Sequence, residues 1–122
     1  MKRTNELTRS ELQVMTILWD IQKGTVNEVL ERFPEPKPAY NTVSTIVRIL
    51  ENKGFVSHKA YGRTYEYFPI VAKEDYTNTY MRTVLDNFFD GSVSRMVNFF
   101  SSQKSISLEE TDEILKILNG DK

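Results

Sequence analysis

The order of the predicted elements constrains the fold of this chain more than any other feature. Three amphipathic helical patterns come first, at about 9–20, 26–33 and 39–52. Two β-prone segments follow within 55–69 and are separated by a short loop that contains Gly62. Strands joined by so short a loop indicate a β-hairpin. Three helices followed by one hairpin is the order of a winged helix-turn-helix. We therefore predict a mostly α fold with a small β-hairpin wing.

Helix starts are marked by capping boxes, in which a Ser or Thr is followed three residues later by a Glu. The sequence has three such pairs: Thr8 with Glu11, Thr25 with Glu28, and Ser107 with Glu110. The helical spacing of apolar residues in the first helix predicts that it buries Leu12, Met15, Leu18 and Trp19.

The second part of the chain, 73–119, is patterned as helix throughout. Element type and charge sign both change near 70–73, so we predict a winged-helix domain at 1–71 and a helical domain at 72–122. About 50 residues are too few to bury two wide apolar faces alone, and a symmetric homodimer is the commonest solution. The side chains expected at the dimer interface are Tyr80, Val84, Leu85, Phe88, Phe89, Met96, Val97, Phe100, Leu115 and Leu118.

Residue types exclude several classes of function. The 122 residues include no Cys and one His, which excludes disulfides, thiol nucleophiles and zinc fingers. The sequence has no apolar run that could span a membrane and no N-terminal secretory pattern. We expect a soluble, cytoplasmic protein that is not an enzyme and uses no metal or cofactor. The single histidine, His58, lies in the first strand, where a surface or phosphate-contact role is expected.

Charge is unevenly distributed along the chain. The formal net charge is -1, but Lys37 to Arg63 holds five cations and a single anion, Glu51. A local basic segment in a nearly neutral chain is typical of a surface that binds nucleic acid, although a solvated face is an equally open interpretation.

The third helix has two chemically different faces. Val43, Ile46, Val47 and Leu50 fall on one side, and Asn41, Ser44, Thr45, Arg48 and Asn52 fall on the other. The polar side has no carboxylate, and its small side chains permit close approach to a partner. Asn, Ser, Thr and Arg are the residue types that bond base edges in the major groove of DNA. Thr42 flanks this face and is predicted to contact phosphate.

The hairpin is expected to place Lys59, Tyr61 and Arg63 beside the DNA backbone, where contacts position a protein without reading sequence. An alternative is a winged-helix module that binds protein and not DNA. Such a module should expose an apolar patch on the third helix, and its binding should lack the steep salt dependence of phosphate contacts.

At these residues the chain resembles the BlaI/MecI penicillinase-repressor family. The resemblance covers nearly the whole chain and is carried by Leu7–Met15 with Leu18-Trp19, by Ala39–Thr45, by Lys53-Gly54, by Gly62–Tyr67 and by Phe88–Ser92. It implies a bacterial repressor that binds palindromic double-stranded operator DNA as a homodimer. It also implies release from DNA after a signal from a membrane sensor-protease. The copper-responsive branch of this family uses C-terminal cysteines, which this chain lacks.

Particular residues match the family's motifs. Thr42 and Thr45 are similar to its pair of recognition-helix threonines, and Asn41 to the residue that precedes them. Many members carry Arg where this chain has Ile49, and here the Arg is Arg48. The family's cleaved bond is an Asn-Phe, which implies cleavage at Asn98–Phe99, although this pair is shifted by one residue from the family's pattern. The alternative is that the aromatic side chains at 99 and 100 form dimer core.

Overall fold

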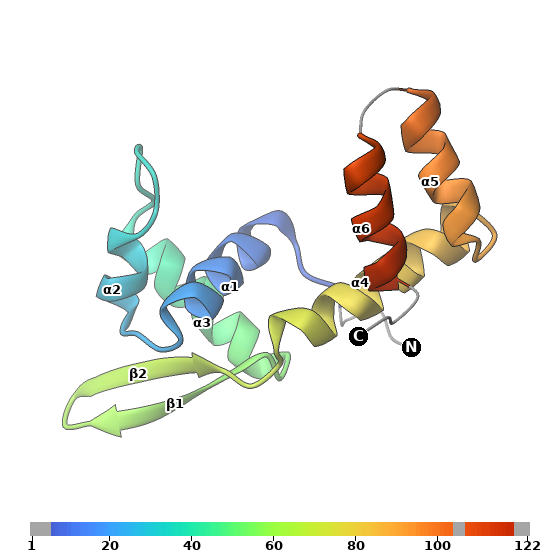
Figure 1. Cartoon of the computed structure of the whole chain (residues 1–122). Helices are drawn as coiled ribbons and strands as arrows, with labels where there is room; N and C mark the ends of the chain where they lie inside the picture. Colours follow the sequence, from blue (N-terminus) through green and yellow to red (C-terminus); the bar gives the residue numbers. More distant parts are fainter. Residues whose placement is uncertain (1–5, 104–106, 119–122) are drawn as a thin grey trace. The chain divides into compact units, whose positions relative to one another are not determined.

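The computed structural model describes residues 6–103 and 107–118 and divides the chain into two compact units, Met1–Asp75 and Tyr76–Lys122 (Figure 1). In the part that it describes, the elements follow the predicted order: α1 (Arg9–Ile21), α2 (Val26–Glu31), α3 (Tyr40–Asn52), β1 (Val56–Tyr61), β2 (Thr64–Pro69), α4 (Lys73–Phe88), α5 (Val93–Ser102) and α6 (Leu108–Leu118). The prediction of a mostly helical chain with one hairpin is confirmed. A domain boundary after residue 71 stays a prediction.

The three predicted capping boxes are present. The Thr8 and Thr25 hydroxyls each accept a hydrogen bond from the backbone N–H of the glutamate three residues later, and that glutamate accepts one from the capping residue. Ser107 and Glu110 make the same reciprocal pair at the start of α6. These bonds satisfy N–H groups that have no partner within the helix, which fixes where each helix begins.

The core of the first unit lies between α1, α2 and α3 and continues under the start of the hairpin. Its buried apolar side chains are Leu7, Val14, Met15, Leu18, Val26, Val29, Phe33, Val43, Val47, Leu50, Phe55, Val56 and Tyr67. The prediction that Leu12 is buried was wrong, because its side chain is 40% exposed and Val14 is buried instead. Trp19 is half-buried, and its ring N–H donates to the Val71 carbonyl at 2.9 Å.

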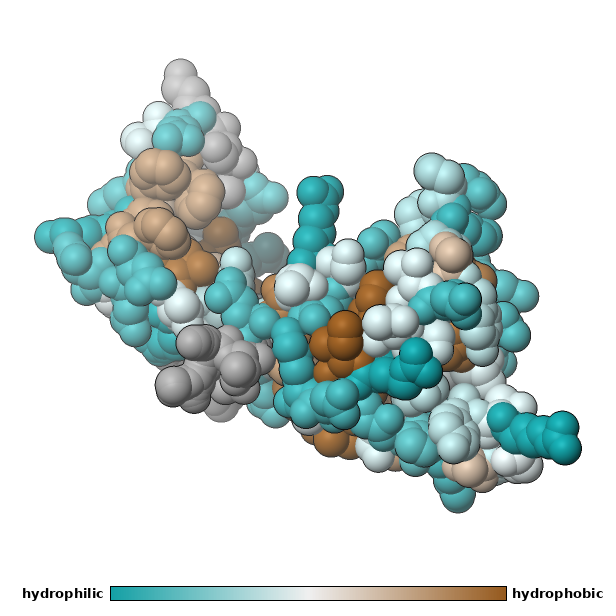
Figure 2. All heavy atoms as spheres, turned by 180° about the vertical axis from the view of Figure 1, so that it is seen from behind, coloured by the Kyte–Doolittle hydropathy of each residue, from teal (hydrophilic) through white to brown (hydrophobic). Residues whose placement is uncertain are grey.

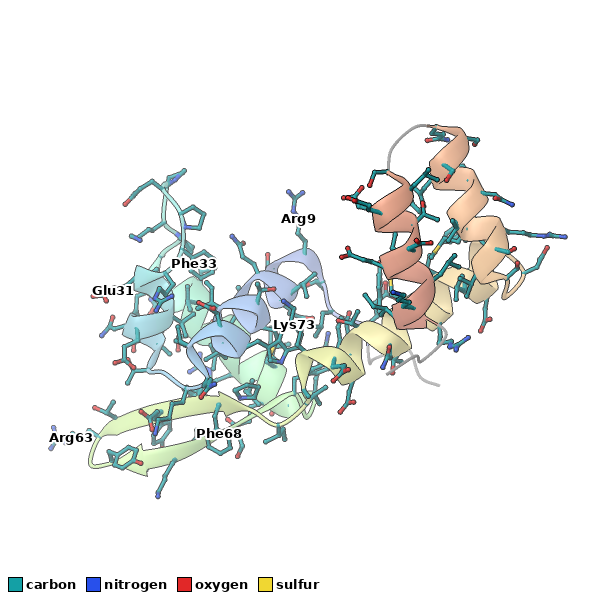
Figure 3. The ribbon with its side chains drawn as sticks, viewed as in Figure 1. Arg9, Glu31, Phe33, Arg63, Phe68 and Lys73 are labelled. Carbon is teal, nitrogen blue, oxygen red and sulfur yellow. The ribbon has the colours of Figure 1, made fainter. Side chains whose placement is uncertain are left out.

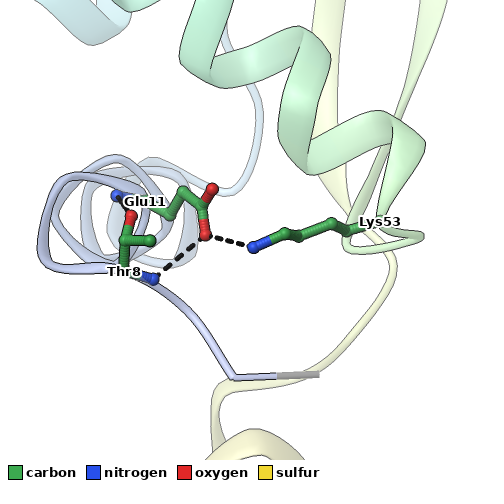
Figure 4. Close-up of polar contacts among 3 residues, drawn as sticks. All are labelled: Thr8, Glu11 and Lys53. Carbon is green, nitrogen blue, oxygen red and sulfur yellow. Dashed lines mark hydrogen bonds and ion pairs between the residues drawn. The ribbon is translucent and has the colours of Figure 1, made fainter. Parts of the chain in front are cut away.

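Glu11 links the first and third helices. Its carboxylate accepts from the Thr8 N–H at 3.0 Å and lies 2.6 Å from the Lys53 ammonium, at the end of α3 (Figure 4). Burial raises the pKa of Glu11, but the bonds from Lys53 and Thr8 outweigh it, so the net effect is a lowered pKa. The start of α1 is thereby bonded to the end of α3.

The hairpin is antiparallel, and its register pairs Val56 with Pro69 and Tyr61 with Thr64. The loop is therefore two residues long, Gly62 and Arg63, and Tyr61, which the sequence places in the loop, belongs to β1. Gly62 has a φ of 65°, the left-handed conformation that a type II′ turn needs at its first position. The Gly24 N–H and C=O bond the backbone of Tyr67 at 2.9 and 2.8 Å, which fastens the hairpin to the α1–α2 connection.

The second unit is helical. Leu85, Met96 and Val97 are buried within it, and the α4–α5 connection turns through Asp90 and Gly91, both with positive φ. Apolar side chains also reach its surface, in the left part of Figure 2. A hollow of about 200 Å³ opens among six of its apolar side chains, from Met81, Met96, Val97, Phe100, Ile114 and Ile117.

Candidate nucleic-acid interface

The α3 helix presents the polar face that its sequence predicts. Val43, Val47 and Leu50 are fully buried, which turns the opposite side of the helix outward. Asn41, Thr42, Thr45, Arg48 and Asn52 are exposed there, and Ser44 is half-buried.

A groove of about 300 Å³ lies between the start of α2, the α3 helix and the wing. It is lined by Thr25, Val26, Asn27, Tyr40, Ser44, Arg48, Arg63, Thr64, Tyr65 and Tyr67. Two predicted α3 residues, Ser44 and Arg48, are thus brought together with Arg63, which projects from the hairpin tip (Figure 3). Asn41, Thr42 and Thr45 are not part of this lining.

The three wing residues lie on different parts of the hairpin. Alternation along the strands places Lys59 and Tyr61 on the face away from His58 and Tyr67. The Lys59 ammonium lies 5.7 Å from the centre of the Tyr61 ring, and Glu66 is its cross-strand partner. Arg63 therefore lines the groove, whereas Lys59 and Tyr61 lie on the outer face of the hairpin.

Not all cations of the basic segment face this groove. The Lys37 ammonium donates to the carbonyls of Glu31 and Phe33, at 2.9 and 2.7 Å, and thereby stabilises the end of α2. Lys53 is paired with Glu11. Within the described residues, the cations of this segment whose side chains take part in neither an ion pair nor a hydrogen bond are Arg48, Lys59 and Arg63.

His58 has a role that the sequence did not predict. Its ring Nδ1 lies 2.7 Å from a carboxylate oxygen of Glu51, and its ring stacks on Tyr65 with centroids 4.2 Å apart. The side chain therefore contacts α3 and β2 and is not a free surface group. Period-two alternation could have identified the inward strand face but not the Glu51 partner.

Tyr67 lies beside this pair, with its ring centroid 5.5 Å from that of His58. Burial, followed by the nearby charge of Glu51, raises the pKa of Tyr67, while the charge of Arg48 acts against this. The hydroxyl of Tyr67 is therefore neutral at physiological pH.

The sequence analysis did not predict four of the residues that line the groove: Asn27, Tyr40, Tyr65 and Tyr67.

The sequence profile described as penicillinase repressor matches residues 7–120. This chain belongs to the penicillinase repressor family. Relatives of this family member include the penicillinase repressor of Bacillus licheniformis, 28% identical over all of this chain and 96% of the relative. Another is the methicillin resistance regulatory protein MecI of Staphylococcus aureus (strain N315), 25% identical over 96% of each chain.

The solved DNA-binding domain of the repressor BlaI has the same fold as the first part of this repressor-family chain. The two superpose with a TM-score of 0.52 at 28% identity, over 62% of this chain and 93% of that domain. The prediction of a winged-helix domain is thereby confirmed.

The residues predicted for the dimer interface occupy different depths in this family member. Leu85, Met96 and Val97 are buried within one copy of the chain. Val84, Phe89, Phe100 and Leu115 are half-buried, and Tyr80 and Phe88 are exposed, Phe88 at 75%. The side chain of Leu118 lies outside the described residues.

The predicted cleavage pair, Asn98 and Phe99, lies inside α5 with both side chains exposed. Along the described ranges, no helix has the length and apolar character to cross a membrane.

Proposed function

We propose that this chain is a transcriptional repressor that binds double-stranded operator DNA through α3 and the tip of the wing. The observation that carries the proposal is the groove in which Ser44 and Arg48 of the helix meet Arg63 of the hairpin. Family membership and the DNA-binding domain of BlaI support it. The chain then acts by occupying DNA and has no catalytic residues, and in a bacterium it works in the cytoplasm.

In this proposal the α3 helix enters the major groove. Asn41, Ser44, Thr45 and Arg48 bond base edges, because amide, hydroxyl and guanidinium groups complement the donors and acceptors found there. Thr42, at the flank of this face, contacts a phosphate. Arg63 follows the adjacent backbone from the wing tip, and Lys59 and Tyr61 contribute backbone contacts from the outer hairpin face.

The second unit supplies the homodimer contact in this proposal. A stable partner is required because Phe88, Tyr80 and Ile117 expose large apolar surfaces to water, with Phe88 at 75% and Ile117 at 65%. The buried Leu85, Met96 and Val97 then support this surface from within. Two copies related by a twofold axis place two α3 helices on a palindromic operator. In this proposal the domain predicted at 1–71 binds DNA and the domain predicted at 72–122 forms the dimer.

Release from DNA by a membrane sensor-protease is the part of the proposal that rests on the family resemblance. Asn98–Phe99 is the candidate bond. Incubation with the cognate sensor tests it: a chain cut between these residues supports the assignment, and an intact chain with repression lost contradicts it.

DNA binding is tested with a fluorescent duplex that the wild-type protein selects from a randomised pool, here called the selected duplex. Fluorescence anisotropy should give a log affinity that falls against log salt with a slope of about -4, since Lys59 and Arg63 on each of two copies contact phosphates and release counterions. A slope near zero, or failure to enrich any duplex, favours the protein-binding alternative.

A further inference from the structure

The one histidine of the chain joins the wing to α3. Its ring Nδ1 lies 2.7 Å from a carboxylate oxygen of Glu51. Both side chains are 31% exposed, so the pair is partly accessible to solvent. Tyr65 stacks on the ring and Tyr67 tilts against it, which restricts where the ring can point. This contact joins β1 to α3, and α3 lines the candidate DNA interface.

Titratable groups from two elements lie around this contact. The α3 helix contributes Glu51 and Arg48, and β2 contributes Tyr65 and Tyr67. Alternation places Lys59 and Glu66 on the outer face of the hairpin. On α1 and α2, Glu11 is paired with Lys53, Asp20 with Arg32, and Glu28 accepts from the Thr25 N–H. Among these groups only a histidine ordinarily changes charge between pH 6 and 8.

The charge of His58 decides what the groove presents to a phosphate. Glu51 lies three residues after Arg48, so its carboxylate borders the polar face of α3, for which the sequence pattern predicted no carboxylate. With a neutral His58, the carboxylate adds a negative charge beside Arg48. With a protonated His58, the pair is neutral and the charged hydrogen bond holds the wing against the helix more firmly. DNA, which is polyanionic, therefore favours the protonated form.

We propose that His58 and Glu51 are a positioning pair through which operator binding takes up a proton. This inference rests on the proposed function, because it requires that α3 and the wing bind DNA. Affinity for DNA is therefore expected to be higher at pH 6 than at pH 8. For a partly exposed pair, the expected fall between pH 6 and pH 8 is about two- to fivefold.

The test measures the affinity for the selected duplex at pH 6, 7 and 8, at constant salt, by fluorescence anisotropy. The full-length chain is compared with His58→Gln and with Glu51→Gln, each of which can keep a hydrogen bond but not the ion pair. Glu66→Gln is the matched control, because it removes a carboxylate from the same hairpin on the opposite face. Circular dichroism at each pH verifies that every variant is folded.

We expect a two- to fivefold fall for the wild type and for Glu66→Gln, and nearly constant affinity for His58→Gln and Glu51→Gln. The Glu51→Gln chain should also bind more tightly than the wild type at pH 8, because the uncompensated carboxylate is gone. A wild-type slope retained by His58→Gln overturns the proposal. A slope lost in His58→Gln but kept in Glu51→Gln also overturns it, since His58 would then contact DNA by itself. Failure to bind at any pH contradicts the proposed function instead.

Discussion

Replacement of Glu11 by Ala should destabilise the first unit by about 2–3 kcal/mol. The loss of the capping box accounts for about 1 kcal/mol, because the Thr8 N–H loses its acceptor. The Lys53 ammonium loses its charged hydrogen bond at 2.6 Å, which adds about 1–2 kcal/mol. The loss of the Lys53 contact costs less than the loss of one partner of a fully buried ion pair. The reason is that the Lys53 side chain is 25% exposed and its ammonium can be hydrated in the variant.

The assay is urea unfolding followed by the fluorescence of Trp19, the single tryptophan, which lies in α1. Glu28→Ala is the matched control, since Glu28 completes the capping box of α2 but is exposed and, among the described residues, pairs with no lysine. It should lose only about 0.5–1 kcal/mol. The difference between the two variants measures the Lys53 contact. A difference below about 0.5 kcal/mol would refute the reasoning that this contact fastens α1 to α3.

Acid should weaken the same contact. Because the pKa of Glu11 is lower in the folded chain than in the unfolded one, its contribution is complete above the unfolded pKa, about 4.3. The contribution is lost as pH falls through the folded pKa. Glu11→Gln should therefore show a smaller loss of stability between pH 5 and pH 3 than the wild type. Equal losses would contradict this assignment.

Three further predictions concern the DNA interface. Arg48→Ala or Thr45→Ala should reduce discrimination between the selected and a random duplex by about 1–3 kcal/mol, measured by gel-shift titration, because a base contact is lost. Arg63→Ala should weaken both duplexes alike and make the salt slope shallower, because its contact is to phosphate. Truncation after Val71 should give a folded monomer by sedimentation, with much weaker DNA affinity, because the bond from Trp19 to Val71 is kept while the second unit is lost.

Opposite outcomes separate these contacts. Unchanged discrimination in the α3 variants would remove Arg48 and Thr45 from base reading. A loss confined to the selected duplex would contradict the phosphate role of Arg63. A dimeric truncated chain would place the dimer contact in the first unit.

Local signals accounted for most of the fold. Thr8, Thr25 and Ser107 fix helix starts through bonds to a glutamate three residues away, so neighbouring residues alone contain the information. The burial of Leu12 was predicted wrongly because helical spacing identifies the apolar face of α1 but not how far burial extends around the helix. The packing of α1 against its neighbours decides which residues at the border of that face are buried.

The candidate site was less predictable. The outward face of α3 follows from periodicity within one helix, and the structure exposes the residues that periodicity selects, apart from the half-buried Ser44. The partners of Lys37, Lys53 and His58 are set by tertiary contacts. A count of charges along the sequence does not reveal such contacts. The basic segment therefore contained two cations that stabilise the fold, and its histidine proved to contact a carboxylate.

The most direct test of the account is to map the DNA-binding surface by NMR. The uniformly ¹⁵N-labelled chain is titrated with the selected duplex, and amide shifts are followed residue by residue. The account predicts that the largest changes fall on 41–48 of α3 and on 62–64 at the wing tip. Changes concentrated on α1 or on the second unit, with α3 unaffected, would contradict the claim that α3 and the wing bind DNA.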